Sequence, residues 1–281
     1  WTNVLLERWL LQLLWAGLAM LPLLAARAWS NQFRRQNLSS AQGMSLTGWS
    51  YGIALLICAG AVLITVLLTL DLLAMAIRDP FQLGEWHPHV LPHDRLSSIV
   101  RLVQAGGIGL AMGWPRLRPW LARTVAGSLV VVVSRAWGIW SLALWIPDES
   151  QTDPLLGADL SFGLGRFSGL HLGLELLVLA ALFTLCFELW RLLAGSKAIS
   201  DWASPELTAR QIQLIRTLLA LPVLGAAGLV WLSRHQLLWQ QHGLVAGAGW
   251  LQAHLTLPLR GLAAFLLVLI AWAVLLPRRR R

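Results

Sequence analysis

The sequence has few of the residues that keep a soluble protein in water. Charged side chains make up only 12% of the 281 residues, whereas apolar side chains make up 57%. A soluble domain typically carries about 25% charged residues. A globular core of this size has no room for so much leucine, alanine and valine. The composition therefore excludes an ordinary soluble domain and predicts a membrane protein.

Cysteine and acidic residues are also scarce. The two cysteines, Cys58 and Cys186, lie in apolar stretches, so we expect small apolar packing side chains and neither a disulfide scaffold nor a cysteine-based zinc site. Acidic residues number 13 against 22 basic ones, which gives a net charge of +9. The basic residues form short clusters between apolar stretches. This distribution is typical of topology signals and argues against nucleic acid as a partner.

Apolar runs long enough to cross a bilayer recur along the chain. A spanning helix needs about 20 apolar residues. We therefore predict an all-α fold, a polytopic transmembrane helix bundle of about seven helices in a single transmembrane domain over residues 1–281. The third span is the weakest because it is short and contains Arg101, so a re-entrant segment stays open there. The predicted spans are residues 4–26, 51–77, 97–114, 123–145, 170–190, 214–231 and 255–276.

The charges of the loops predict an orientation. If alternate loops face the cytoplasm, starting after the first span, those loops and the tail hold 14 Lys or Arg, and the opposite loops hold 4. The positive-inside rule then places the Arg278–Arg281 tail in the cytoplasm. Many of the 17 tryptophans fall at span ends, as expected for interfacial anchors. We expect a bacterial inner membrane, or a thylakoid membrane in a photosynthetic source.

Ionisable side chains within the predicted spans are the main candidates for function, because charge is costly in lipid. Asp71, Arg101, His171 and Glu175 fall at similar predicted depth, and Arg135 lies near the middle of its span. His171 and Glu175 share a helix face at a spacing of four residues. We predict an outward-facing polar cluster. It would be either a vestibule for a cation, a proton or a polar ligand, or a structural ion-pair network.

The histidines form a second pattern, because all seven fall on or near the predicted outer side. His87, His89 and His93 lie with two carboxylates in the ten residues 85–94. Imidazole and carboxylate suit a divalent metal, but the spacing matches no established zinc motif, so a hydrated interfacial loop is the alternative. His171 is also a candidate axial ligand for a tetrapyrrole. No other cofactor is predicted.

Two stretches in the second half resemble a known bacterial family. Residues 153–162, Asp-Pro-Leu-Leu-Gly-Ala-Asp-Leu-Ser-Phe, resemble its D-P-x-F-G-x-D-x-S-F loop. Residues 231–250 are similar to its W-L-x-R-x-x-L-L…G-x-x-x-G-A-G-Y segment, and Leu257-Pro258 matches the dipeptide that opens its next span. The family is uncharacterised protein family 0182, a group of bacterial multi-spanning membrane proteins.

The resemblance implies an N-terminal membrane bundle followed by a large extracytoplasmic domain. The family's function is not established, so no catalytic residues carry over. The chain departs from the pattern after Phe162, where Gly-Leu-Gly stands for Y-x-F, and at Trp250-Leu-Gln252, which stands for Tyr-Thr-Asp. Because the chain opens at Trp1 without an initiator Met, we expect a fragment or a processed product, the membrane region only.

Three functions remain open. The first is an accessory or scaffold subunit of a larger membrane assembly, with the lipid bilayer and other membrane subunits as partners. The second is a transporter or channel that uses the polar cluster. The third is a metal- or tetrapyrrole-binding membrane protein. The sequence has no Walker A loop, G-x-S-x-G elbow, H-E-x-x-H helix or G-x-G-x-x-G turn, so an enzyme is not predicted.

Overall fold

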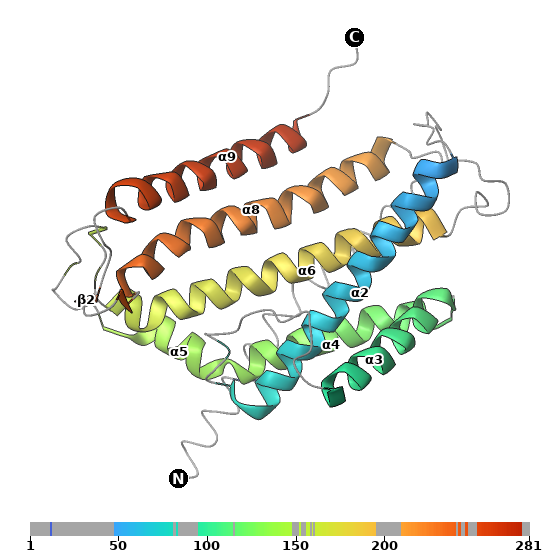
Figure 1. Cartoon of the computed structure of the whole chain (residues 1–281), viewed down its shortest axis with the longest axis horizontal. Coiled ribbons are helices and arrows are strands. Elements are labelled where there is room, and N and C mark those ends of the chain that lie inside the picture. Colours follow the sequence, from blue (N-terminus) through green and yellow to red (C-terminus); the bar gives the residue numbers. More distant parts are fainter. Residues whose placement is uncertain are drawn as a thin grey trace. The chain divides into compact units, whose positions relative to one another are not determined.

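The described part of the chain is helical, which confirms the all-α fold. The computed structural model describes residues 12, 48–80, 83, 95–114, 116–147, 152, 156–157, 159, 161–194, 209–239, 241–242, 245–246 and 252–276. Apart from residue 12, the predicted span 4–26 lies outside them. The helices are α2 (Gly48–Arg78), α3 (Arg95–Gly113), α4 (Arg118–Arg135), α5 (Trp137–Trp145), α6 (Phe167–Ala194), α8 (Ala209–Trp239) and α9 (Leu257–Leu275) (Figure 1).

Shorter elements lie beside the long helices. A π-helical turn, η2 (Phe162–Arg166), leads into α6, and a second, η3 (Gln252–Thr256), leads into α9. Two strands, β1 (Gln241–His242) and β2 (Val245–Ala246), pair antiparallel in a ladder of two residues each. These short elements therefore adjoin the start of α6, the end of α8 and the start of α9.

Four described stretches are long and apolar enough to cross a membrane. Each overlaps one of the predicted spans, and they are Gly52–Arg78, Phe167–Leu193, Gln211–Leu237 and Gln252–Leu275. The predicted span 123–145 corresponds to α4 and α5, which are bent by 52° and would make a fifth span if counted together. The apolar part of α3 is shorter, Ile99–Gly113, as its sequence led us to expect.

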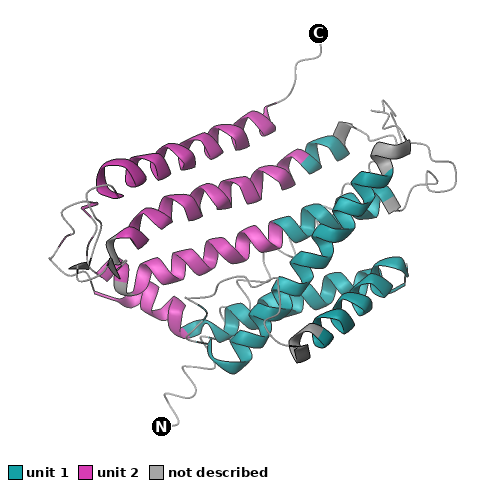
Figure 2. Ribbon diagram, in the orientation of Figure 1, with its two compact units in different colours: residues 1–137, 182–215 teal, residues 138–181, 216–281 magenta. Residues whose placement is uncertain are grey.

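The chain divides into two compact units. Unit 1 comprises residues 1–137 and 182–215, and unit 2 comprises residues 138–181 and 216–281 (Figure 2). Helices α6 and α8 contribute a part to each unit. The single transmembrane domain that we predict over the whole chain stays a prediction.

The core of unit 1 forms where α2 packs on α3 and α4. The almost fully buried residues of α2 follow one another at intervals of three or four positions and so share one face, and they include Val62, Val66, Thr69 and Leu72. Val125 and Val132 of α4 are equally buried. Two buried threonines of α2 do not disturb this apolar contact, because each hydroxyl donates a hydrogen bond to a carbonyl one turn earlier.

Glycines control the helix packing in unit 2. A Cβ atom added at Gly169 of α6 would lie 2.5 Å from the Cβ of Ala143 in α5. One added at Gly225 of α8 would lie 2.4 Å from Cγ2 of Val178 in α6. Both distances are shorter than real contacts, so only glycine allows these helices to approach so closely.

Candidate functional site

Two of the predicted cluster residues form an ion pair in unit 1. Nη2 of Arg101 in α3 donates a hydrogen bond to Oδ2 of Asp71 in α2 at 2.5 Å. The side chains are 19% and 28% exposed, so the pair is largely removed from the surface. Burial strengthens the attraction between the two charges and makes loss of either partner costly. The pair therefore joins two helices.

Two further residues of the predicted cluster meet in unit 2. Nδ1 of His171 lies 3.5 Å from Oε1 of Glu175 within α6. Their side chains are 17% and 14% exposed. The ring of Phe167, one turn earlier, lies 5.6 Å from the imidazole. The spacing of four residues predicts this contact, which stays within a single helix and joins no others.

The predicted cluster of five is divided between the two units. Asp71, Arg101 and Arg135 belong to unit 1, whereas His171 and Glu175 belong to unit 2. Arg135 is the last residue of α4 and has no ion-pair partner among the described residues. A cation at a helix C-terminus is favoured by the backbone dipole. The two pairs are present, and their union into one vestibule stays a prediction.

The candidate metal ligands His87, His89 and His93 lie outside the described residues, so that site stays a prediction. Within the described ranges, no three His, Cys, Asp or Glu side chains are grouped closely enough to hold a metal ion. Cys58 and Cys186 are partly buried free thiols. A tetrapyrrole ligand role for His171 likewise remains a prediction.

The two stretches that carry the family resemblance contact each other in unit 2. In the first stretch, the backbone N–H of Ser161 donates to Oδ1 of Asp159 at 2.7 Å, and the N–H of Phe162 donates to the carbonyl of Asp159 at 3.0 Å. This turn directs Phe162 toward α8, where its ring lies 4.7 Å from that of His235 in the second stretch. The sequence motifs alone did not predict this contact.

Two arginines beside that contact were missed by the sequence reasoning. The guanidinium carbon of Arg234 in α8 lies 4.3 Å from the centroid of Trp231, a cation–π contact. Nη1 of Arg260 in α9 donates a hydrogen bond to the carbonyl of Ser233. One signal in the sequence could have found them, because residues 207–281 contain no Asp or Glu. Arg234 and Arg260 therefore have no acid nearby in the chain.

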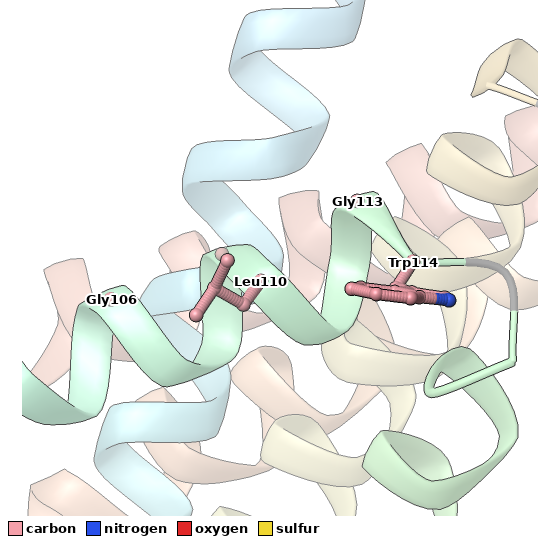
Figure 3. A pocket seen from close by; sticks show the side chains of 5 residues that line it. Gly106, Leu110, Gly113 and Trp114 are labelled. Carbon is pink, nitrogen blue, oxygen red and sulfur yellow. The ribbon is translucent and has the colours of Figure 1, made fainter.

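Unit 1 has a shallow, open and largely apolar hollow on one face of α3 (Figure 3). Its lining residues repeat at three- and four-residue intervals, so they share one side of the helix. Leu110 and Trp114 are 68% and 60% exposed. Such a surface suits lipid tails or an apolar helix, and its lining residues include no ionisable side chain. The lining residues are Gly106, Gly109, Leu110, Gly113 and Trp114.

The long apolar helices, with ionisable residues paired between or within them, define a polytopic α-helical membrane protein. The sequence matches the uncharacterised protein family (UPF0182) over residues 4–281, and the chain belongs to that family. This match extends the resemblance found in the second half to nearly the whole chain. It also agrees with the family that the two motif stretches indicated.

The relatives are cyanobacterial proteins of the same family. A UPF0182 protein of Synechococcus sp. strain CC9605 is 75% identical over 279 residues, which cover 99% of this chain and 30% of the relative. One from Synechococcus sp. strain CC9902 is 45% identical over 96% of this chain and 29% of the relative. The chain thus spans under a third of the length of these relatives. No solved structure matches the chain.

Proposed function

We propose that the chain is an accessory or scaffold subunit of a larger membrane assembly. The pairing of its carboxylates carries this proposal. Asp71 is bonded to Arg101 of the neighbouring helix, and Glu175 lies beside His171. A carboxylate occupied in this way is less available to a passing ion or substrate, and the pair of Asp71 also joins α2 to α3.

The apolar surface of α3 and α9 supports the same proposal. Val103 of α3 is 70% exposed, and Phe265 and Trp272 of α9 are about 60% exposed. Lipid tails or the helices of a partner subunit would cover such side chains. The matched region makes up only 30% and 29% of two of the relatives. In those proteins it is joined to a much longer chain, which fits a role beside further protein.

The proposed setting is the inner membrane or the thylakoid membrane of a bacterium. The cyanobacterial sources of the relatives support it. The proposed topology places the Arg278–Arg281 tail in the cytoplasm, as the loop charges predict. Labelling a cysteine introduced at the tail tests the topology. A membrane-impermeant maleimide should react only when the cytoplasmic face is open.

A transporter or channel is the second candidate. It is favoured by His171 and Glu175, which lie side by side in α6, because ionisable side chains within a span often mark the path of an ion or substrate. The candidate requires a polar path that connects these groups with water.

Native purification in mild detergent tests the proposal. The chain is expressed in its host and recovered with its partners, and proteins, pigments and metals in the purified material are identified. A stoichiometric membrane protein that survives gel filtration would support the scaffold role. If the chain instead runs alone and colourless and conducts ions in liposomes, the scaffold proposal fails and transport replaces it. Bound metal or pigment would identify the third function.

A further inference from the structure

The ends of α8 and α9 in unit 2 bring two arginine side chains to one helix contact. Arg260 of α9 reaches toward α8, where it donates to the carbonyl of Ser233. Arg234 of α8 reaches toward α9, because a Cβ added at Gly261 would lie 3.8 Å from both Cζ and Nη1 of Arg234. The two side chains therefore approach the same narrow contact from opposite helices.

No carboxylate balances these two charges in the described part of the chain. Among those residues, Asp71, Glu175 and Glu188 pair with Arg101, His171 and Arg191, and no acid forms an ion pair with Arg234 or Arg260. Residues 207–281, which contain both helices, have no Asp or Glu at all. Two arginines near each other in an apolar helix pair repel and lose hydration, which disfavours the contact unless an anion joins it.

The hydrogen bonds of Arg234 are also incomplete. Its Nε is buried and has no hydrogen-bond partner among the described residues. The face of Trp231 attracts the guanidinium at 4.3 Å, but a ring face accepts no strong hydrogen bond. The Nε–H of Arg234 is therefore left for an acceptor that the described residues do not supply.

A second buried polar group lies in the same part of unit 2. Ser161 is completely buried, and its Oγ has no hydrogen-bond partner among the described residues. The next residue, Phe162, contacts the ring of His235, which follows Arg234 in α8. The start of α6 and the adjoining ends of α8 and α9 lie together in Figure 1. Unsatisfied donors thus gather at this end of unit 2.

We propose that Arg234 and Arg260 form a binding site for a phosphate-class oxyanion. Guanidinium groups present planar pairs of N–H donors that match two oxygens of a phosphate, and the bonds are strengthened by charge. Trp231 holds the guanidinium of Arg234 at the contact. The loop charges predict that this end of unit 2 faces away from the cytoplasm. The phosphate belongs either to a phospholipid headgroup of that leaflet or to a free anion.

The experiment measures binding to the purified full chain with two probes. Nanodiscs of phosphatidylglycerol are compared with nanodiscs of phosphatidylcholine, whose phosphate is neutralised by choline. In detergent, sodium phosphate is titrated against sodium chloride, and thermal unfolding reports binding. If phosphatidylglycerol stabilises the protein and sodium phosphate does not, the ligand is a lipid headgroup. If sodium phosphate also stabilises the protein, the site binds a free anion. If neither probe stabilises the protein, the proposal is wrong.

Variants assign the binding to these residues. Arg234→Gln and Arg260→Gln should each raise the half-saturating concentration of the active probe about tenfold, because each removes charge-assisted bonds. Arg216→Gln is the matched control, since Arg216 lies on the same helix about 27 Å away, and it should bind as the unchanged chain does. The proposal is overturned if the Arg234 and Arg260 variants bind the probe as tightly as the unchanged chain does. It is also overturned if the Arg216 variant loses as much affinity as they do.

Arg234→Lys is a more conservative variant for the case in which Arg234→Gln does not fold. Lysine keeps the positive charge but presents no planar fork, so we expect binding weaker than in the unchanged chain and tighter than in Arg234→Gln. Gel filtration and helical circular dichroism establish that each variant is folded. If only Arg234→Lys folds, undiminished phosphate affinity in that variant contradicts the role of the guanidinium. The site does not depend on the scaffold proposal, because binding is measured on the chain alone.

Discussion

The two units attach their helices in different ways. In unit 1, arginines hold α3 at both ends. Arg101 bonds to Asp71 of α2, and Arg118 of α4 donates from Nε to the carbonyl of Met112 at 3.0 Å. In unit 2, α5 and α8 instead approach α6 through Gly169 and Gly225, where no side chain separates the helices. Charge thus attaches α3 in unit 1, whereas close backbone packing attaches α5 and α8 to α6 in unit 2.

The same glycine spacing has opposite surroundings in the two units. Gly169 and Gly173 of α6 face Ala143 and Trp140 of α5. Gly109 and Gly113 of α3 have the same four-residue spacing, yet a Cβ at either would meet no described atom within 4 Å. Small residues permit close packing but do not require it. The neighbour that a glycine faces decides whether the spacing contributes to stability.

The largest expected effect is loss of the ion pair in unit 1. Asp71→Asn leaves Arg101 partly buried beside a neutral amide, and we expect a loss of about 3 kcal/mol in the free energy of unfolding. Unfolding in a denaturing detergent, followed by circular dichroism, measures it. The double variant Asp71→Asn/Arg101→Gln should recover part of the loss, because no charge is then left unpaired. No recovery would mean that the pair does not hold α3.

The next effect tests the glycine contact of unit 2. Gly169→Val forces a branched side chain against Ala143, whose Cβ would already lie 2.5 Å from a new Cβ. We expect destabilisation of about 1–3 kcal/mol. Gly109→Val in α3 is the matched control and should change stability by no more than about 0.5 kcal/mol. Equal losses at both positions would remove the distinction between packed and open glycines.

Loss of Arg118, the second arginine that attaches α3, should lower stability less than loss of the Asp71–Arg101 pair. The guanidinium of Arg118 bonds to the carbonyl of Met112 and lies 4.5 Å from the ring centroid of Trp190 in α6. Arg118→Gln keeps a donor but removes the cation, so we expect a loss of about 1 kcal/mol, measured by thermal unfolding. Arg116→Gln, two residues earlier, controls for the loss of charge alone. A larger loss at Arg116 would contradict the assigned role.

The sequence predicted features that depend on position along one helix better than features that depend on tertiary packing. The helical spacing predicted the contact between His171 and Glu175. The similar predicted depth of Asp71 and Arg101 in the membrane predicted that these two residues lie close together. The contact of Phe162 with His235 and the approach of Arg234 to Gly261 join distant parts of the chain. No local period indicates which side chains meet across such distances, because helix rotation and loop path decide that.

The 52° break between α4 and α5 was also outside the sequence prediction. The predicted span 123–145 contains no proline. Ser134 and Arg135 interrupt its apolar run just before Ala136, but we predicted no bend there. The backbone leaves the helix there at a ψ of 14°. The following helix, α5, is the one that packs on the glycines of α6. Apolar composition predicts that a segment lies in a membrane, but it does not predict where the segment bends.

The smallest expected effect concerns the pair within α6, and it tests whether the two units share one polar cluster. Glu175→Gln removes a contact with His171 on the same helix, so stability should change by no more than about 0.5 kcal/mol. Unfolding in denaturing detergent, compared directly with Asp71→Asn, measures the difference. A loss as large as that of Asp71→Asn would mean that Glu175 also holds another helix. That result would favour the predicted union of the two pairs, since a carboxylate that bonds only along its own helix cannot stabilise helix packing so strongly.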